Sequence, residues 1–259
     1  MLSWLFRRRR TQLLGMSLSP LWQQWVAANV WHWHVLNPMQ RQRLSGLIHL
    51  FVNEKNFEGC DGMKITPQVK VTIAAAACLL LLGFDDSYCF DQVRSILVYP
   101  RPTVQRNLRR SDGVVDESKW LSGMAQQGGP IVLSWRDVLM DSRDDQRTSH
   151  VVLHEFAHLI DGLDGAMEGV PPLPTEPQKE RWKEVASREL DNLRRSVRSG
   201  ESTCLDLYGA ESPAEFFAVA TEAFYCNGRL LSIEHPELYE LLAELYKIQT
   251  APWFESSPP

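Results

Sequence analysis

Apolar residues recur at helical spacing along most of the chain. Asn37 and Pro38 open a helix predicted over 38–52. Its apolar face consists of Leu44, Leu47, Ile48 and Phe51. The segment 73–84 is almost wholly apolar and follows Thr66 and Pro67, so it predicts a buried helix. It is too short to span a bilayer, and we expect no transmembrane segment.

Two short runs rich in β-branched residues predict strands, at 95–99 and 130–134. Between them, 101–129 is polar and contains glycines, which predicts a long loop or a hairpin that covers the functional site of the protein. Its arginines are interpreted as a solvated face rather than a ligand clamp: Arg106, Arg109 and Arg110. An exposed sheet edge can bind an added strand, and 130–134, which shortly precedes the apolar segment at 151–160, is the candidate edge strand.

An apolar helix is predicted over 151–160. Apolar residues cover nearly every side of it: Val151, Val152, Leu153, Phe156, Leu159 and Ile160. Such a helix lies in a protein core. Thr148 and Ser149 are candidate N-caps, and Gly162 and Gly165 permit a left-handed end. Further helices are predicted over 178–198, 213–225 and 236–246, so the expected fold class is α+β, mostly helical, with a small sheet.

This apolar helix carries three side chains that can bind a metal or transfer a proton: His154, Glu155 and His158. Residues i and i+4 share a helix face, so the two imidazoles can bind one tetrahedral metal ion. Glu155 then lies beside the open coordination position, where a general base is needed. Because unpaired buried charge is costly, a divalent cation accounts for these residues; the alternative is histidines bonded to backbone. His150 lies one turn earlier, roughly 5 Å along the axis, so we expect a capping or supporting role for it.

A catalytic zinc site needs a third protein ligand. Ser212 begins a predicted helix on which Glu215 and Glu222 share a face, seven residues apart. Glu215 is the candidate ligand; its alternative role is a capping box with Ser212. Glu222 is the reserve ligand, or else it orients a histidine. Asp161 and Asp164 either orient the histidines or cap the end of their helix.

Several runs of the chain resemble a known family. They are 154–165 and 212–218, together with the shorter runs 53–59, 96–100 and 129–135. These runs are similar to those of the Mlc titration factor A family, bacterial zinc-dependent peptidases of the gluzincin type. The resemblance extends from about residue 38 to about residue 246, and the set of motifs as a whole makes it specific.

The resemblance implies a zincin-like metallopeptidase domain with the small sheet beside the helix of the HExxH motif. It implies that His154, His158 and Glu215 bind zinc and that Glu155 is the catalytic base. It also implies that Tyr208, seven residues before the third ligand, lies near the metal. A phenol there can donate a hydrogen bond to the oxyanion of a tetrahedral intermediate; the alternative is a residue at the rim of the site.

Family members are reported to bind the glucose-regulated repressor Mlc and to cleave small aminopeptidase substrates. The resemblance therefore implies two partners, a peptide substrate and an Mlc-type transcriptional repressor. The predicted function is hydrolysis of peptide bonds, aminopeptidase-like, by a zinc-activated water with Glu155 as general base. One alternative is a non-catalytic protein that sequesters a regulator and holds a structural or regulatory zinc. Another is a purely structural zinc site, which would need four protein ligands.

Composition narrows the class of protein. The 259 residues are 44% hydrophobic and 23% charged, as in ordinary globular proteins. The net charge of −5 means that the chain has no overall positive charge to attract nucleic acid, so we expect no direct nucleic acid binding. The 5 cysteines have no paired CxxC spacing and predict reduced thiols in a cytoplasmic protein.

One zincin-like domain is expected over 20–250, between two tails. The run from Arg7 to Arg10 follows a short apolar stretch, whereas a secretory signal has its charges first. Residues 1–19 are therefore predicted to be a flexible, solvated tail, with weak contact to an anionic membrane as the alternative. Residues 251–259 are predicted to be a disordered tail.

Overall fold

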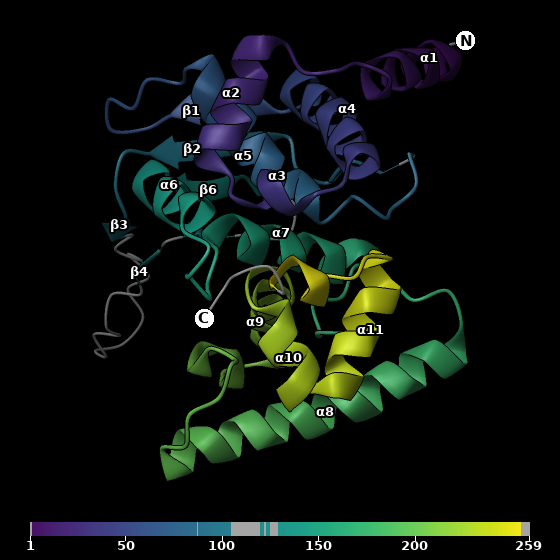
Figure 1. The fold of residues 1–259 in the computed structure, drawn as a ribbon, viewed down its shortest axis with the longest axis vertical. Helices are drawn as coiled ribbons and strands as arrows, with labels where there is room; N and C mark the ends of the chain where they lie inside the picture. Colours follow the sequence, from purple (N-terminus) through teal and green to yellow (C-terminus); the bar gives the residue numbers. More distant parts are fainter. Residues whose placement is uncertain (1, 87, 105–119, 122, 125–128, 255–259) are drawn as a thin grey trace, which may run out of the picture.

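The structure is a computed structural model that describes residues 2–86, 88–104, 120–121, 123–124 and 129–254. Helices make up most of these residues, and a small sheet lies among them (Figure 1). The predicted fold class, α+β and mostly helical, is confirmed. The arginines predicted to form a solvated face at 106–110 lie outside the described residues.

The N-terminal half contains the helices α1 (Leu2–Leu14), α2 (Pro20–Asn29), α3 (His32–Val35), α4 (Pro38–Glu54) and α5 (Pro67–Leu79). Asn37 caps α4 in a capping box with Gln40, and a proline occupies the first turn, as predicted. Thr66 caps α5, which packs against α4 and is buried over nearly its whole length. These two helices build the core of this half.

The predicted flexible tail is wrong where residues 2–14 form α1, which packs against α4. The Arg10 guanidinium forms an ion pair with Glu54 at 2.7 Å and another with Asp91. A Cβ at Gly46 of α4 would lie 2.1 Å from the carbonyl oxygen of Leu14, so only glycine permits this close approach. A run of arginines looks solvated in sequence because its carboxylate partners come from distant segments.

The main sheet has the strand order β1-β2-β6-β5. Strands β1 (Asn56–Gly59), β2 (Ser95–Tyr99) and β6 (Ile131–Ser134) are parallel, and β5 (Gly123–Met124) is antiparallel to β6. Ile96 pairs with Phe57 on one side and Ile131 on the other, and all three side chains are buried. The strands β3 (Thr103–Val104) and β4 (Trp120–Leu121) form a separate antiparallel pair, which agrees with a hairpin within 101–129.

The prediction that 130–134 is the edge strand is wrong. Strand β6 bonds to β2 on one side and to β5 on the other, so β5 is the terminal strand of the described sheet. The apolar pattern of a strand shows that the strand is buried, but it does not show where the strand lies in the sheet. With two residues, β5 is too short to leave any pattern in the sequence.

Helix α6 (Trp135–Arg143) follows β6 directly, and α7 (Val151–Asp161) then crosses the middle of the molecule (Figure 1). The N-terminal half lies on one side of α7 and the C-terminal helices on the other. The Phe156 ring packs on Phe90 and Phe51, with ring centroids 4.7 and 5.6 Å away. Helix α7 also contacts β5 and β6, which confirms the small sheet beside this helix.

The C-terminal half comprises η1 (Gly162–Asp164), α8 (Glu176–Ser199), η2 (Leu207–Ala210), α9 (Pro213–Cys226), α10 (Gly228–Glu234), α11 (Pro236–Tyr246) and η3 (Ala251–Phe254). Helix α9 packs on α7, α8, α10, α11 and η2. The left-handed glycine predicted after α7 is Gly165, with a φ of 92°. Within the predicted C-terminal tail, 251–254 form η3, and 255–259 lie outside the described residues.

Gly169, in the loop before α8, joins three helices. Its N–H donates to Asp161 Oδ2 of α7 at 3.0 Å, and its carbonyl accepts from Trp182 Nε1 of α8 at 2.7 Å. Its φ is 73°, and a Cβ there would lie 2.3 Å from the carbonyl oxygen of Pro213, the first residue of α9. No other residue type fits this crossing without strain.

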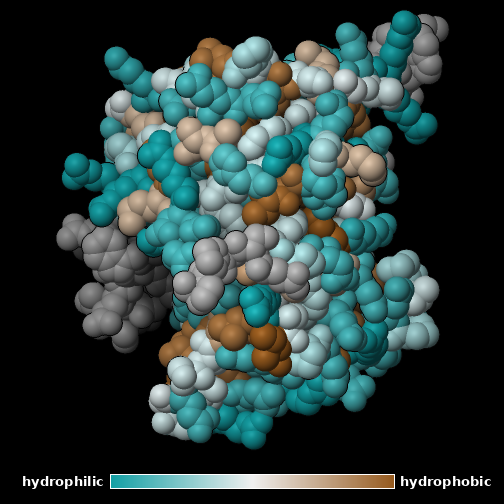
Figure 2. All heavy atoms as spheres, in the orientation of Figure 1, coloured by the Kyte–Doolittle hydropathy of each residue, from teal (hydrophilic) through white to brown (hydrophobic). Residues whose placement is uncertain are grey.

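Within the described part of the chain, no helix combines the length and apolarity needed to cross a membrane. The face seen in Figure 2 is mostly hydrophilic. A group of hydrophobic residues lies over α10, where Leu230 and Ile233 are exposed (Figure 2). The single zincin-like domain at 20–250 stays a prediction.

Candidate metal centre

Helix α7 begins at Val151, and the N-caps predicted at 148–149 are wrong. His150 holds the N-cap position, and its side chain makes no capping bond. Carboxylates from two other helices accept the first backbone N–H groups instead: Asp141 Oδ2 from Val151 at 3.0 Å, and Glu222 Oε2 from His150 at 2.5 Å. These caps escape sequence analysis because only the tertiary fold brings α6 and α9 to this helix end.

The three predicted metal ligands meet between α7 and α9. His154 and His158 project from α7 with their Nε2 atoms 3.2 Å apart. Glu215, in the first turn of α9, has its Oε2 3.0 Å from His154 Nε2 and 3.5 Å from His158 Nε2. One ligand atom from each residue lies within 4.8 Å of the other two. The structure thus places one carboxylate oxygen and two imidazole nitrogens around a common point.

The start of α9 explains how Glu215 reaches this point. Ser212 is the N-cap and its hydroxyl accepts from the Glu215 N–H at 3.2 Å, while Pro213 occupies the first turn, as predicted. The Glu215 carboxylate bonds to His154 across the interface with α7. This contact favours the ligand role of Glu215 over the capping-box alternative.

The hydrogen bonds of His154 create a need for a cation. Its Nδ1 lies 2.6 Å from Glu222 Oε1, so the neutral ring is assigned a proton on Nδ1 that it donates to Glu222. The Nε2 lone pair then faces the Glu215 carboxylate at 3.0 Å, and two acceptors repel. A proton relieves this: burial lowers the pKa of His154, but the bonds to Glu215 and Glu222 outweigh it and raise it to about 10.

A divalent ion would relieve the same repulsion. Two imidazole nitrogens, one carboxylate oxygen and an open fourth position form a donor set that zinc adopts in catalytic sites. Burial favours a higher pKa for Glu215, but the hydrogen bonds from His154 and His158 outweigh it and lower this pKa to about 2. The carboxylate therefore stays ionised. The residues present therefore fit a zinc ion.

Glu222 fits the orienting role that was the alternative to metal binding. One oxygen holds His154 Nδ1 and the other caps α7, so the carboxylate supports the ring from behind. The hydrogen bonds of Asp161 and Asp164 go to the backbone N–H groups of Gly169 and Ala166, at 3.0 and 3.1 Å. This favours the helix-end role for these aspartates over the orientation of a histidine.

Glu155 lies on α7 between the two histidines and is only 4% exposed. Its Oε2 atom has no hydrogen-bond partner among the described residues. Burial raises the pKa of Glu155 to about 7, and electrostatic interactions with the His154 and His158 side chains oppose that rise. A buried carboxyl group that titrates near neutrality and has an unengaged oxygen is suited to exchange protons.

Tyr208 lies in η2 with its ring centroid 6.1 Å from that of His154. Its main-chain N–H donates to the Asp206 carboxylate at 2.9 Å, which fixes this turn. Burial raises the pKa of Tyr208 to about 12, and the Glu215 carboxylate adds to the effect. The phenol is therefore protonated near neutral pH and available as a donor. At 43% exposed, it also occupies the rim, so both predicted roles fit its position.

His150 lies outside the ligand cluster, in line with the supporting role expected for it. Its Nε2 bonds to Ser142 Oγ at 3.1 Å, and burial lowers the pKa of His150 to about 3, so the ring is neutral. Sequence analysis missed Asp141, which caps α7 and forms an ion pair with Arg147 at 2.9 Å. A lone aspartate in a charged amphipathic segment gives no signal that distinguishes it from a solvated one.

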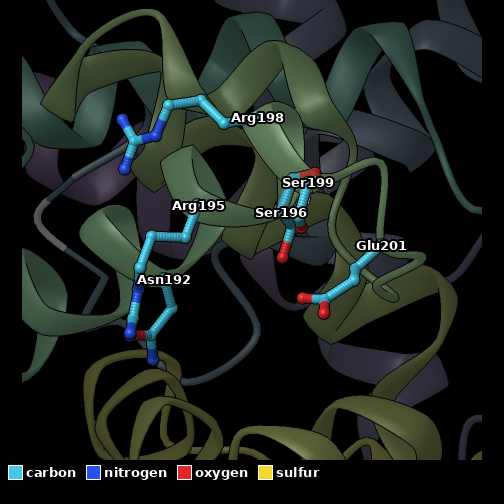
Figure 3. A pocket seen from close by; sticks show the side chains of 6 residues that line it. All are labelled: Asn192, Arg195, Ser196, Arg198, Ser199 and Glu201. Carbon is cyan, nitrogen blue, oxygen red and sulfur yellow. Dashed lines mark hydrogen bonds between the residues drawn. The ribbon is translucent and has the colours of Figure 1, made fainter.

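A separate cavity of about 610 Å³ lies at the C-terminal end of α8 (Figure 3). It is lined by Asn192, Arg195, Ser196, Arg198, Ser199 and Glu201. Arg195 donates a hydrogen bond to Asn192 across one wall. None of the candidate site residues lines this cavity, so it is distinct from the metal centre.

Known proteins are similar in sequence to this chain over most of its length. The family described as glucose-regulated metallo-peptidase M90 matches residues 4–247, including N-terminal residues that the motifs do not reach. An uncharacterized protein of Synechocystis sp. is 35% identical over 93% of this chain and 88% of its own length. Proteins named Mlc titration factor A are 31% identical in Serratia proteamaculans, over 82% of this chain and 81% of theirs, and 30% identical in Klebsiella pneumoniae, over 82% and 80%. The chain therefore belongs to the glucose-regulated metallo-peptidase M90 family, together with Mlc titration factor A.

Proposed function

We propose that the chain is a zinc-dependent peptidase. The observation that carries this proposal is the convergence of His154, His158 and Glu215 beside the buried carboxyl group of Glu155. Membership of a metallo-peptidase family supports it. When bound, zinc supplies a Lewis acid that activates water and polarises the substrate carbonyl.

The side chains of the chain then perform the proton transfers. Glu155 accepts the proton of the attacking water and delivers it to the leaving amine. Burial, which raises the pKa of Glu155 to about 7 in the metal-free protein, favours a proton on this carboxyl group. Tyr208 donates its phenolic hydrogen to the developing oxyanion. Glu222 holds the His154 ring with Nε2 toward Glu215, where both residues would hold the zinc ion.

The peptide substrate lies along the sheet and is cleaved beside α7. Strand β5 is terminal in the described sheet and contacts α7, so a substrate strand paired with β5 would lie near the helix that carries the HExxH motif. The aminopeptidase-like preference rests on the family resemblance. It predicts that a free substrate N-terminus is required, so N-acetylated peptides should be cleaved poorly.

The test compares the wild-type protein with Glu155→Gln. Each is assayed for zinc content and against a peptide library whose members carry free or acetylated N-termini. We expect Glu155→Gln to keep its zinc and lose hydrolysis, because the amide cannot accept the proton. Normal turnover by this variant would refute the base assignment. Zinc-loaded wild type that cleaves no member would favour the non-catalytic alternative.

The relatives named Mlc titration factor A support a second function, binding of an Mlc-type transcriptional repressor. This binding needs no hydrolysis. Glu155→Gln should therefore bind a purified Mlc-type repressor as tightly as the wild type does, as measured by isothermal titration calorimetry. No heat of binding with either protein would refute this function and leave the peptidase proposal untouched.

A further inference from the structure

A second cluster of metal-ligating side chains lies outside the candidate centre. We propose that Cys204, Glu234 and His235 form a second site for a divalent transition-metal ion of the zinc class. One ligand atom from each residue lies within 4.8 Å of the other two. The cluster shares no residue with His154, His158 and Glu215, and it joins the loop after α8 to the junction of α10 and α11.

The orientation of His235 suits metal binding. Its Nδ1 lies 2.8 Å from Glu189 Oε2, so Nε2 is the nitrogen that would bind an ion. A carboxylate behind one imidazole nitrogen fixes the tautomer and makes the other nitrogen a better ligand. The Glu189 and His235 side chains are only 10% and 15% exposed, and Asn192 donates a further hydrogen bond to Glu189 at 3.2 Å. The ring is therefore held in place before any ion arrives.

The other two ligands are also held together. The Cys204 N–H donates to Glu234 Oε2 at 3.1 Å, so the thiol and the carboxylate share one short stretch of surface. The Glu234 carboxylate beside the thiol is negatively charged and attracts a cation, and the ion would displace the thiol proton when it binds. Thiolate, imidazole and carboxylate together are a donor set that zinc accepts.

An ion at this site would brace the loop that leads to the metal centre. Cys204 lies four residues before Tyr208, the proposed oxyanion donor in η2. His235 and Glu234 lie on the C-terminal helices, which pack against α8 and α9. Binding would therefore join this loop to the helical body. With three protein ligands and partial exposure, the site suits an exchangeable ion rather than a permanent structural one.

Cobalt(II) distinguishes the two sites, because a thiolate ligand gives a near-ultraviolet charge-transfer band that nitrogen and oxygen ligands do not give. The full-length protein is titrated with Co²⁺ in the absence of added thiols. We expect this band in the wild type and its complete loss in Cys204→Ser. Cys60→Ser is the matched control, because Cys60 is also half-buried and free, and it should keep the band. A wild type without the band, or Cys204→Ser with it, would overturn the proposal.

A second variant separates this inference from the peptidase proposal. Glu215→Ala removes a ligand of the candidate centre but none of the second site, so it should keep the full thiolate band. Loss of the band in Glu215→Ala would show that the two sites are not independent and would overturn the assignment. His235→Ala should weaken Co²⁺ binding at the thiolate site at least tenfold. Unchanged Co²⁺ binding would show that His235 is not a ligand of this site.

Discussion

Single residues decide how the candidate centre works, and the sequence reveals only some of them. The spacing of His154, Glu155 and His158 is local, so the motif alone identifies them. Glu215 and Glu222 share one face of α9, and the sequence cannot decide which one faces the histidines. That choice depends on how far α9 is displaced along α7, which is a property of tertiary packing. The structure places Glu215 at Nε2 of His154 and Glu222 at Nδ1.

The two carboxylates on α9 should differ in their effect on metal content. Glu215→Ala removes a ligand, so the purified variant should lose the zinc of this centre and contain at most the ion of the proposed Cys204 site. Glu222→Gln keeps the shape of the side chain that supports His154, so it should still load zinc, with affinity about 10–100-fold weaker. Elemental analysis after dialysis against buffered zinc measures both. If Glu222→Gln lost its zinc and Glu215→Ala kept it, Glu222 would be the ligand and Glu215 the supporting residue.

Tyr208→Phe tests the phenol. Loss of one donor to an oxyanion lowers kcat by about 100-fold or more, while zinc content should not change. Steady-state kinetics with the best peptide of the library measures the effect. An unchanged kcat would leave Tyr208 as a rim residue only.

The elements depend on one another more than their own sequences suggest. The helices and the parallel strands are visible as apolar patterns, whereas α1, β5 and the caps of α7 depend on contacts with distant segments. Helix α7 begins where Asp141 of α6 and Glu222 of α9 accept its first N–H groups. These carboxylates replace the local cap that Thr148 or Ser149 would provide.

The cap from α6 predicts a dependence of stability on pH. Burial raises the pKa of Asp141 from 3.8 to about 6. The folded state therefore holds this proton more tightly than the unfolded state, and the stability it contributes is lost as pH rises from 3.8 through 6. Asp141→Asn has no such proton. Its free energy of unfolding relative to wild type should rise by up to about 3 kcal/mol across this window.

Urea unfolding at several pH values measures this difference directly. Other buried carboxyl groups such as Asp161 titrate in both proteins and cancel in the comparison. A constant difference between pH 4 and 6.5 would show that Asp141 titrates normally in the folded protein.

At the scale of the whole molecule, the candidate metal centre lies where the two halves meet on α7. Gly169 fixes this arrangement because it contacts α7, α8 and the start of α9. The sequence offers no warning of its importance, since glycine in a loop is common and the close contact with Pro213 is long-range. The position of Glu215, two residues after Pro213, depends on this contact.

Gly169→Ala should therefore disturb both stability and metal binding. Left-handed strain and the contact with Pro213 together should cost roughly 2–5 kcal/mol of unfolding free energy. Zinc affinity should fall because α9 must shift. Gly62→Ala is the control, since Gly62 has a similar φ of 76° but nothing within 4 Å of the added Cβ. Equal losses in the two variants would contradict a special role for the Gly169 crossing.

The proposed ligands also come from segments far apart in the chain, because His154 and Glu215 are separated by 61 residues. An unfolded chain cannot hold all three ligands together, so zinc would bind the folded state far more tightly than the unfolded one. At a free zinc concentration 100 times its dissociation constant, this selective binding adds about 2.7 kcal/mol to stability. A chelator should therefore lower the melting temperature of the wild type more than that of Glu215→Ala, which retains only the proposed Cys204 site, and scanning calorimetry measures the difference. Metal scarcity would then shorten the lifetime of each copy in the cell as well as silence it, because proteases act on the opened chain.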